Sequence, residues 1–219
     1  MPRRMPRFDI GLLNQAASAV SIAVAGEIAH ASGTPPIRRE WSTSRLEALY
    51  ELAYMRTFAA WEYCLESIFF RSLCGYSSAA GQELIAVNGG VYFRTIATAE
   101  AAVLGPRRSF LLWGTPNVVI TRCQQHFRSG VGCPCQQEMV ISSHLARLEH
   151  LASIRNRIVH DQNDARSKFD VAALSIAGRT YGGSRPGKLL RDWDSTTAPP
   201  RRWLETTIGE LTALAAQMV

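Results

Sequence analysis

The residues with the clearest chemical potential lie in the stretch LASIRNRIVHDQNDAR, residues 151–166, which holds Arg155, Asn156 and His160 as Arg-Asn-x-x-x-His. In a helix of 3.6 residues per turn, Asn156 and His160 share one face. Arginine can stabilise negative charge on phosphate oxygens, and histidine can move protons near neutral pH. The pattern therefore indicates phosphate chemistry. The competing interpretation is an ordinary basic helix end, because the helix dipole favours Arg and His there.

Two long apolar-periodic segments must position this motif. Residues 44–73 and residues 136–160 each carry large apolar side chains at helical spacing, which predicts two long helices. Further helices are predicted over residues 8–31 and 164–177, and from Pro199 to the end of the chain. Shorter ones are expected within residues 98–104 and 115–127. No convincing run of alternating residues predicts a strand, so the expected class is all-α, an antiparallel helical bundle.

The chain divides by composition into a short and a long part. Residues 1–40 are expected to form an N-terminal helix and linker, because SGTPPIRRE interrupts the helical pattern. Residues 41–219 are expected to form the main helical domain, with an irregular insert at about 76–130. In this domain the expected inward side chains of the second long helix are Met139, Ile141, Leu145, Leu148, Leu151, Ile154 and Ile158.

The motif IRNRIVH, residues 154–160, at the end of a late helix in a basic chain resembles the HEPN superfamily of helical RNases, toxins and defence proteins. The resemblance covers residues 44–73 and 136–219. It implies metal-independent RNA cleavage by a homodimer, in which two copies of the motif line one cleft and leave a 2′,3′-cyclic phosphate. It also implies catalytic roles for Arg155, Asn156 and His160.

Neighbouring residues receive supporting roles. Arg157 is expected to contact the RNA backbone, and Asp161 lies next to the site and is assigned to the same RNA-binding group. Glu62 lies among aromatic residues on the first long helix. Because a buried carboxylate requires a partner, Glu62 is expected to pair with Arg155. Gln162 stands where many members paired with nucleotidyltransferases have a tyrosine, so regulation by modification of that tyrosine is not expected.

Two other interpretations stay open. The chain could be a catalytically inactive HEPN-like module that binds RNA, a nucleotide or a protein partner. It could also be a helical scaffold unrelated to that superfamily. An antitoxin or companion defence protein is a further expected partner of an active toxin.

A cysteine-histidine cluster offers a possible metal site. Cys123, His126, Cys133 and Cys135 are spaced Cys-x-x-His-x₆-Cys-x-Cys and contain four zinc-type ligands. The Cys-x-Cys end departs from the usual two-residue spacing, so reduced cysteines beside a surface histidine are the favoured interpretation. No metal and no other cofactor is expected.

Charge and composition favour a polyanion partner. The net charge is +6, and of the 24 basic residues only Lys168 and Lys188 are lysines. Arginine forks suit phosphate groups, although codon usage could also explain the excess. Residues 8–31 faintly resemble a secretory signal, but Asn14, Gln15 and Glu27 interrupt the apolar run. A soluble amphipathic helix, no membrane association and a cytoplasmic location are expected.

Overall fold

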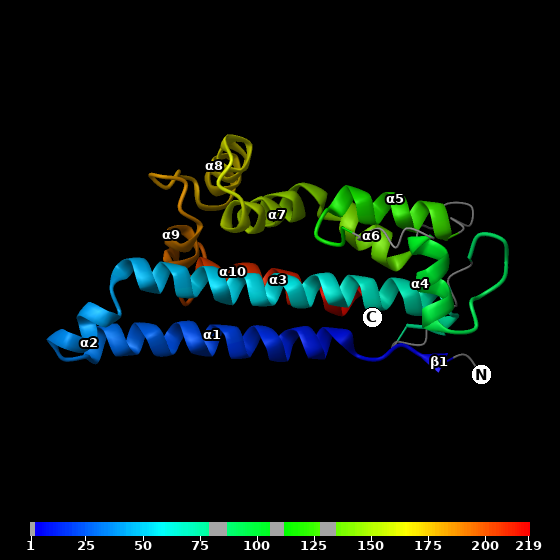
Figure 1. Ribbon diagram of the computed structural model, residues 1–219, viewed down its shortest axis with the longest axis horizontal. Helices are drawn as coiled ribbons and strands as arrows, with labels where there is room; N and C mark the ends of the chain where they lie inside the picture. The colour runs from blue at the N-terminus through cyan, green and yellow to red at the C-terminus, as the bar shows by residue number, and fades with distance from the viewer. Residues whose placement is uncertain (1–2, 79–86, 106–111, 128–134) are drawn as a thin grey trace. The chain divides into compact units, whose positions relative to one another are not determined.

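The computed structural model describes residues 3–78, 87–105, 112–127 and 135–219, and 72% of the structure is helical. The helical class predicted from the sequence is confirmed. The described helices are α1 Phe8–Ser32, α2 Pro35–Glu40, α3 Thr43–Leu73, α4 Ile96–Leu104, α5 Pro116–His126, α6 Gln136–Ser143, α7 Leu145–Val159, α8 Asn163–Ala177, α9 Pro186–Arg191 and α10 Trp203–Met218 (Figure 1).

Within the described ranges, the strands are four two-residue pieces. β1 Arg3–Arg4 pairs in parallel with β2 Tyr76–Ser77, and β3 Trp193–Asp194 pairs antiparallel with β4 Arg201–Arg202. The second pair separates α9 from α10, so α10 begins at Trp203 and not at the prolines predicted to open it.

The chain forms two compact units. Residues 1–12, 61–148 and 212–219 make the first unit, and residues 13–60 and 149–211 make the second. The boundary near residue 40 that composition suggests stays a prediction.

The first unit is centred on aromatic side chains at the end of α3. Phe69 contacts the rings of Phe70, Trp113 and Phe127 at centroid distances of 5.2 to 5.5 Å. Trp113 precedes α5 and Phe127 follows it, so this cluster fixes both ends of α5 against α3. The Gln137 amide on α6 donates to the Leu65 carbonyl at 2.9 Å and fixes α6 on the same helix.

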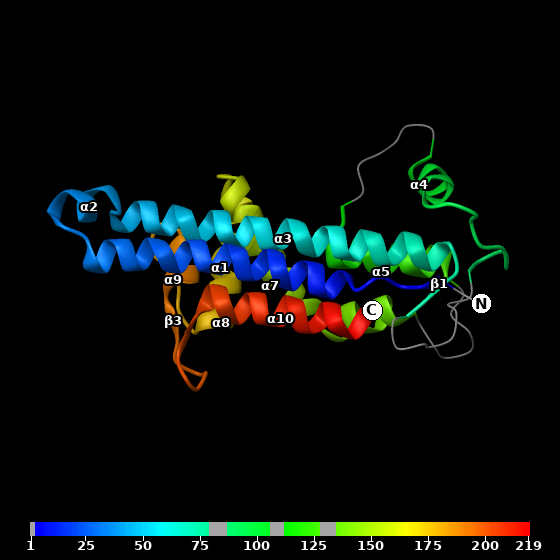
Figure 2. The same ribbon diagram turned by 90° about the horizontal axis from the view of Figure 1, so that it is seen from below.

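The second unit contains parts of α1 and α3, which run side by side in both views (Figures 1 and 2). Small residues allow this close approach: a Cβ added at Gly26 would lie 2.6 Å from the Leu49 side chain. Tyr54 of α3 is fully buried, and its hydroxyl donates to the Leu151 carbonyl of α7 at 2.8 Å. The apolar face of α3 in this unit is buried at Leu46, Tyr50 and Phe58, and that of α10 at Trp203, Leu204 and Ile208.

The prediction of one continuous helix over residues 136–160 is wrong at one point. The chain breaks at His144, which has φ −119° and ψ 19° and ends α6. Neither proline nor glycine causes this break. The His144 ring nitrogen lies 3.0 Å from the Val140 carbonyl, so the side chain competes for a backbone group of the helix. Met139 was expected to point inward but is 37% exposed, whereas Ile141, Leu148, Leu151 and Ile154 are buried as predicted.

Helix α1 differs from the amphipathic helix that was expected. Its buried positions are mostly small, such as Ala16, Ala19 and Ala23, while its large apolar side chains are exposed, namely Ile10, Leu13, Ile22, Val24 and Ile28. Among the described helices, α1 has a length and composition that would also allow it to cross a bilayer. Core helices and N-terminal signal sequences share these properties, so they assign no location to the chain.

Candidate functional site at the end of helix α7

The buried face of α7 determines where the motif lies. Leu148, Leu151 and Ile154 face the core. Arg155 and Asn156 follow Ile154 directly and therefore turn away from this face, Arg155 half-buried and Asn156 exposed. The helix ends at Val159, so the motif occupies the last turn of α7 and the first residue beyond it.

The structure joins the side chains of Arg155 and Asn156, and it joins His160 to Asn156 through the backbone. The Arg155 guanidinium donates to the Asn156 side-chain oxygen at 3.2 Å. The backbone N–H of His160 donates to the Asn156 carbonyl at 2.8 Å, which makes His160 the cap of the last turn. The His160 side chain is exposed. No ion pair neutralises Arg155 within the described ranges, so its charge is available to an anion from solution.

Arg157 has a structural role at the end of α7, and its expected contact with the RNA backbone stays a prediction. Its side chain is 13% exposed, and its guanidinium donates to the Ser184 carbonyl at 3.0 Å and to the His160 carbonyl at 3.1 Å. It also forms an ion pair with Asp161 at 2.9 Å. Arg157 therefore ties the end of α7 to the turn that contains Ser184 and fixes the backbone of His160.

Asp161 is bound by two arginines. Besides Arg157, the Arg166 guanidinium of α8 donates to it at 2.7 Å. The bond from Arg166, together with the weaker influence of Arg157, holds the pKa of Asp161 below its usual value. An exposed carboxylate held in this way neutralises basic side chains near the motif and orders the turn between α7 and α8.

We expect Arg157→Ala to lower the free energy of unfolding by about 2 kcal/mol, because two backbone carbonyls lose a charged donor. It should also lower any activity at His160 by about tenfold, since the end of α7 loses its anchor. Urea unfolding measures the first effect. Arg166→Ala is the matched control. It also removes an arginine that pairs with Asp161, but the Arg166 side chain lies at the surface. Equal destabilisation by both variants would contradict the anchoring role.

Glu62 is half-buried on α3, in the compact unit formed by residues 1–12, 61–148 and 212–219. Arg155 belongs to the other unit. The pairing of Glu62 with Arg155 therefore stays a prediction.

The cysteine-histidine cluster is described in part, because Cys133 lies outside the described residues. The Cys123 thiol is buried and hydrogen-bonds to the Cys135 sulfur; this bond and burial raise the pKa of Cys123, and the same bond lowers the pKa of Cys135. The Cys135 sulfur accepts the Glu138 N–H at 3.4 Å and thus caps α6. His126 packs against the edge of a phenylalanine ring, and burial lowers its pKa. No metal-binding group of three or more ligands occurs among the residues that the structure describes.

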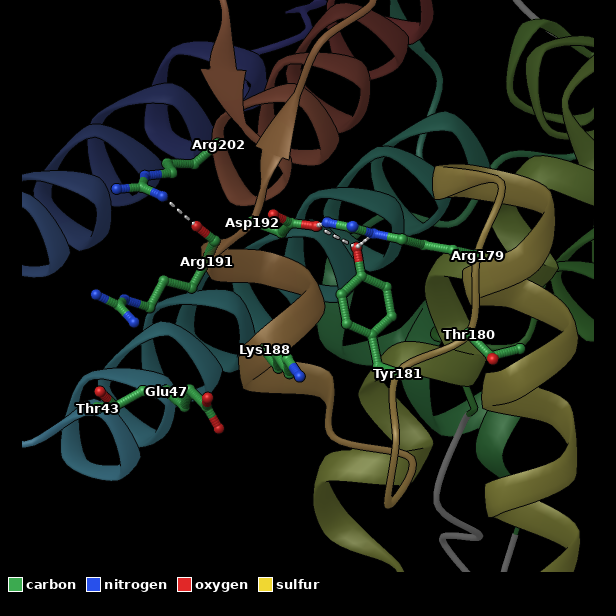
Figure 3. A pocket seen from close by; sticks show the side chains of 9 residues that line it. All are labelled: Thr43, Glu47, Arg179, Thr180, Tyr181, Lys188, Arg191, Asp192 and Arg202. Carbon is green, nitrogen blue, oxygen red and sulfur yellow. Dashed lines mark hydrogen bonds and ion pairs between the residues drawn. The ribbon is translucent and has the colours of Figure 1, made fainter.

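Sequence reasoning missed a polar pocket of about 340 Å³ in the second unit (Figure 3). Its walls come from the start of α3, the segment after α8, α9, and the residues around the β3–β4 pair. The lining side chains are Thr43, Glu47, Arg179, Thr180, Tyr181, Lys188, Arg191, Asp192 and Arg202. One signal for this pocket was present in the sequence. The chain has only two lysines, and one of them, Lys188, lines the pocket.

A carboxylate organises one wall of this pocket. Glu27 of α1 accepts two bonds from Arg191, at 2.6 and 3.1 Å, and lies 4.0 Å from Arg202. Burial would raise the pKa of Glu27, but the bonds from Arg191 outweigh it and hold this pKa below its usual value. Tyr50 is buried beside Glu27 and hydrogen-bonds to it. Burial and the nearby carboxylate raise the pKa of Tyr50 to about 12.

The raised pKa of Tyr50 predicts a loss of stability in alkali. In the unfolded chain the phenol ionises near pH 10, whereas in the folded chain it stays neutral up to about pH 12. The stability contribution is therefore complete below about pH 10 and is lost as the pH rises towards 12. We expect Tyr50→Phe to reduce this loss by about 2 kcal/mol, measured by urea unfolding across that range. An unchanged pH dependence would contradict the assignment.

Comparison with protein-family models, curated proteins and solved structures finds no match to this chain. The function is therefore inferred from the chemistry and placement of the residues described above.

Proposed function

We propose that this chain is a metal-independent endoribonuclease of the HEPN type. One observation supports the proposal above the others: Arg155, bound to Asn156, and the exposed His160 all stand at the end of α7, while Arg157 holds that end in place.

The proposed reaction uses groups of the RNA itself. The ribose 2′-oxygen forms a bond to the adjacent phosphorus, and the bond from phosphorus to the 5′-oxygen of the next nucleotide breaks. The proton of the 2′-hydroxyl passes to a base, and the leaving 5′-oxygen takes a proton from an acid. Imidazole suits both transfers near neutral pH, and the Arg155 guanidinium would stabilise the charge on the non-bridging oxygens. Asn156 would orient Arg155, as its present hydrogen bond does.

A homodimer completes this arrangement. One copy of the motif supplies one histidine, whereas the reaction requires a base and an acid at the same time. Two copies of the α7 end around one cleft would supply both groups and two guanidinium groups. We therefore propose a homodimer with RNA as substrate, acting as a toxin or defence effector in the cytoplasm, with an antitoxin or companion protein as a possible further partner.

The decisive experiment is digestion of total RNA by the purified full-length chain in EDTA, with analysis of the product ends. Products with 2′,3′-cyclic phosphate and 5′-hydroxyl ends are expected. Specific activity should fall on dilution below the dimer dissociation constant. RNA binding without cleavage would replace this proposal by the binding-module alternative. Neither binding nor cleavage would favour a helical scaffold.

A further inference from the structure

The pocket of the second unit has a wall geometry that suits a small anion. Lys188 projects from α9 between Glu47 of α3 and Tyr181, which follows α8 (Figure 3). The hydroxyl-bearing Thr43 and Thr180 line the same space. At about 340 Å³, the pocket is near the lower end of the range for small-molecule sites.

Most charges around the pocket are already paired. Arg179 and the Tyr181 hydroxyl both donate to Asp192, Arg185 donates to Glu47, and Arg191 donates to Glu27. These pairs hold the walls in place and contribute little net charge.

Lys188 is different from its neighbours. It is exposed to solvent and lines the pocket, and no carboxylate pairs with it in the part of the chain that the structure describes. Lys168, the other lysine of the chain, is paired with Asp164 at 2.8 Å on the surface of α8. The two lysines therefore differ in whether a carboxylate already neutralises the ammonium group, and this decides how strongly each attracts an anion.

The local charge balance leaves an excess of positive charge. Four basic side chains, Arg179, Lys188, Arg191 and Arg202, line the pocket, against the two carboxylates of Glu47 and Asp192. The excess of two charges matches the charge of a phosphate monoester at pH 7, which is about −1.5 to −2. An internal phosphodiester of RNA carries a single negative charge and matches it less well.

We propose that this pocket binds the phosphate group of a small phosphate monoester, with the Lys188 ammonium as its principal contact. Lysine can act as a point charge towards phosphate. This site is built from residues other than Arg155, Asn156 and His160, and the inference does not depend on the proposed nuclease activity.

The two lysines make a direct test possible. Reductive methylation with ¹³C keeps their charge and gives separate NMR signals for Lys168, Lys188 and the N-terminal amine, assigned with single-lysine variants. Titration with inorganic phosphate and with ribose 5-phosphate should shift the Lys188 signal and leave the Lys168 signal unchanged. Dimethyl phosphate, a monoanionic diester, and ribose should have no such effect. Equal shifts of both lysines, or none of Lys188 at millimolar phosphate, would overturn the proposal.

Calorimetry on the unlabelled chain gives an independent measurement. Lys188→Ala should weaken the binding of ribose 5-phosphate by about tenfold or more, and Lys188→Glu by about a hundredfold or more. The matched control Lys168→Ala should bind as the wild type does. Because Lys188 is exposed, both variants should unfold at wild-type temperature, and both should cleave RNA at the wild-type rate if the chain is a nuclease. Unchanged affinity in Lys188→Glu would place the ligand elsewhere.

Discussion

We expect alanine at Arg155 or at His160 to lower RNA cleavage in EDTA by about 10²- to 10⁴-fold, which is the range for loss of a proton-transfer group or of a charge that stabilises the transition state. Both side chains lie at the solvent-accessible end of α7, and neither supports the core. The expected loss is therefore in the rate of the chemical step, while the thermal unfolding temperature and the helical content stay at wild-type values. Cleavage of a short fluorescent RNA under single-turnover conditions measures this rate.

A matched variant separates this effect from a general loss of charge. Arg56→Ala removes an exposed arginine that donates to Gln15. It is expected to retain wild-type cleavage. If the Arg155 and His160 variants cleave as fast as this control, the activity comes from a contaminant and the motif is an ordinary helix end.

A second large effect is expected at Gly187, where α9 meets α3. A Cβ at this position would lie 2.4 Å from the Glu47 carbonyl oxygen and 2.7 Å from its carbonyl carbon. The Gly187 N–H also donates to the Glu51 carboxylate at 2.8 Å. Because the obstacle is backbone, it cannot rotate away. We expect Gly187→Ala to lower the free energy of unfolding by at least about 2 kcal/mol and to displace Lys188 and Arg191 from the pocket.

Gly182→Ala is the matched control for this prediction, since an added Cβ there meets no atom within 4 Å. Its free energy of unfolding should stay within about 0.5 kcal/mol of the wild type. Urea denaturation of both variants is the measurement. A Gly187→Ala variant as stable as the control would show that α9 does not lie this closely against α3.

The long helices could be predicted from the sequence because apolar periodicity reports burial directly. The inward face of α3 is buried over its whole length, as expected, and α5 begins after Thr115 at the predicted proline. The break at His144 could not be predicted, because it arises from a side chain that competes for a backbone carbonyl and not from a helix-breaking residue. The six residues of α9 are too few to show periodicity.

The candidate site was predictable only where it is local in sequence. Asn156 and His160 lie four positions apart on one helix end, so helical geometry alone places them on one face. The role of Arg157 depends on Ser184, 27 positions further along the chain. The pocket was harder still to predict from the sequence, because it depends on contacts such as that between Glu47 and Arg185, which are 138 positions apart in the chain. Contacts of this kind follow from tertiary packing, which no local pattern encodes.

The exposure of the motif has a consequence for how such a chain evolves. Arg155 and His160 lie where substitution costs little folding energy, whereas the anchor Arg157 is largely enclosed. A single nucleotide change could therefore abolish the proposed chemistry and leave an intact, well-folded protein. Selection for folding alone would preserve the scaffold and lose the arginine and histidine within a lineage. Related chains that retain both residues at these positions would accordingly reveal selection for the activity itself.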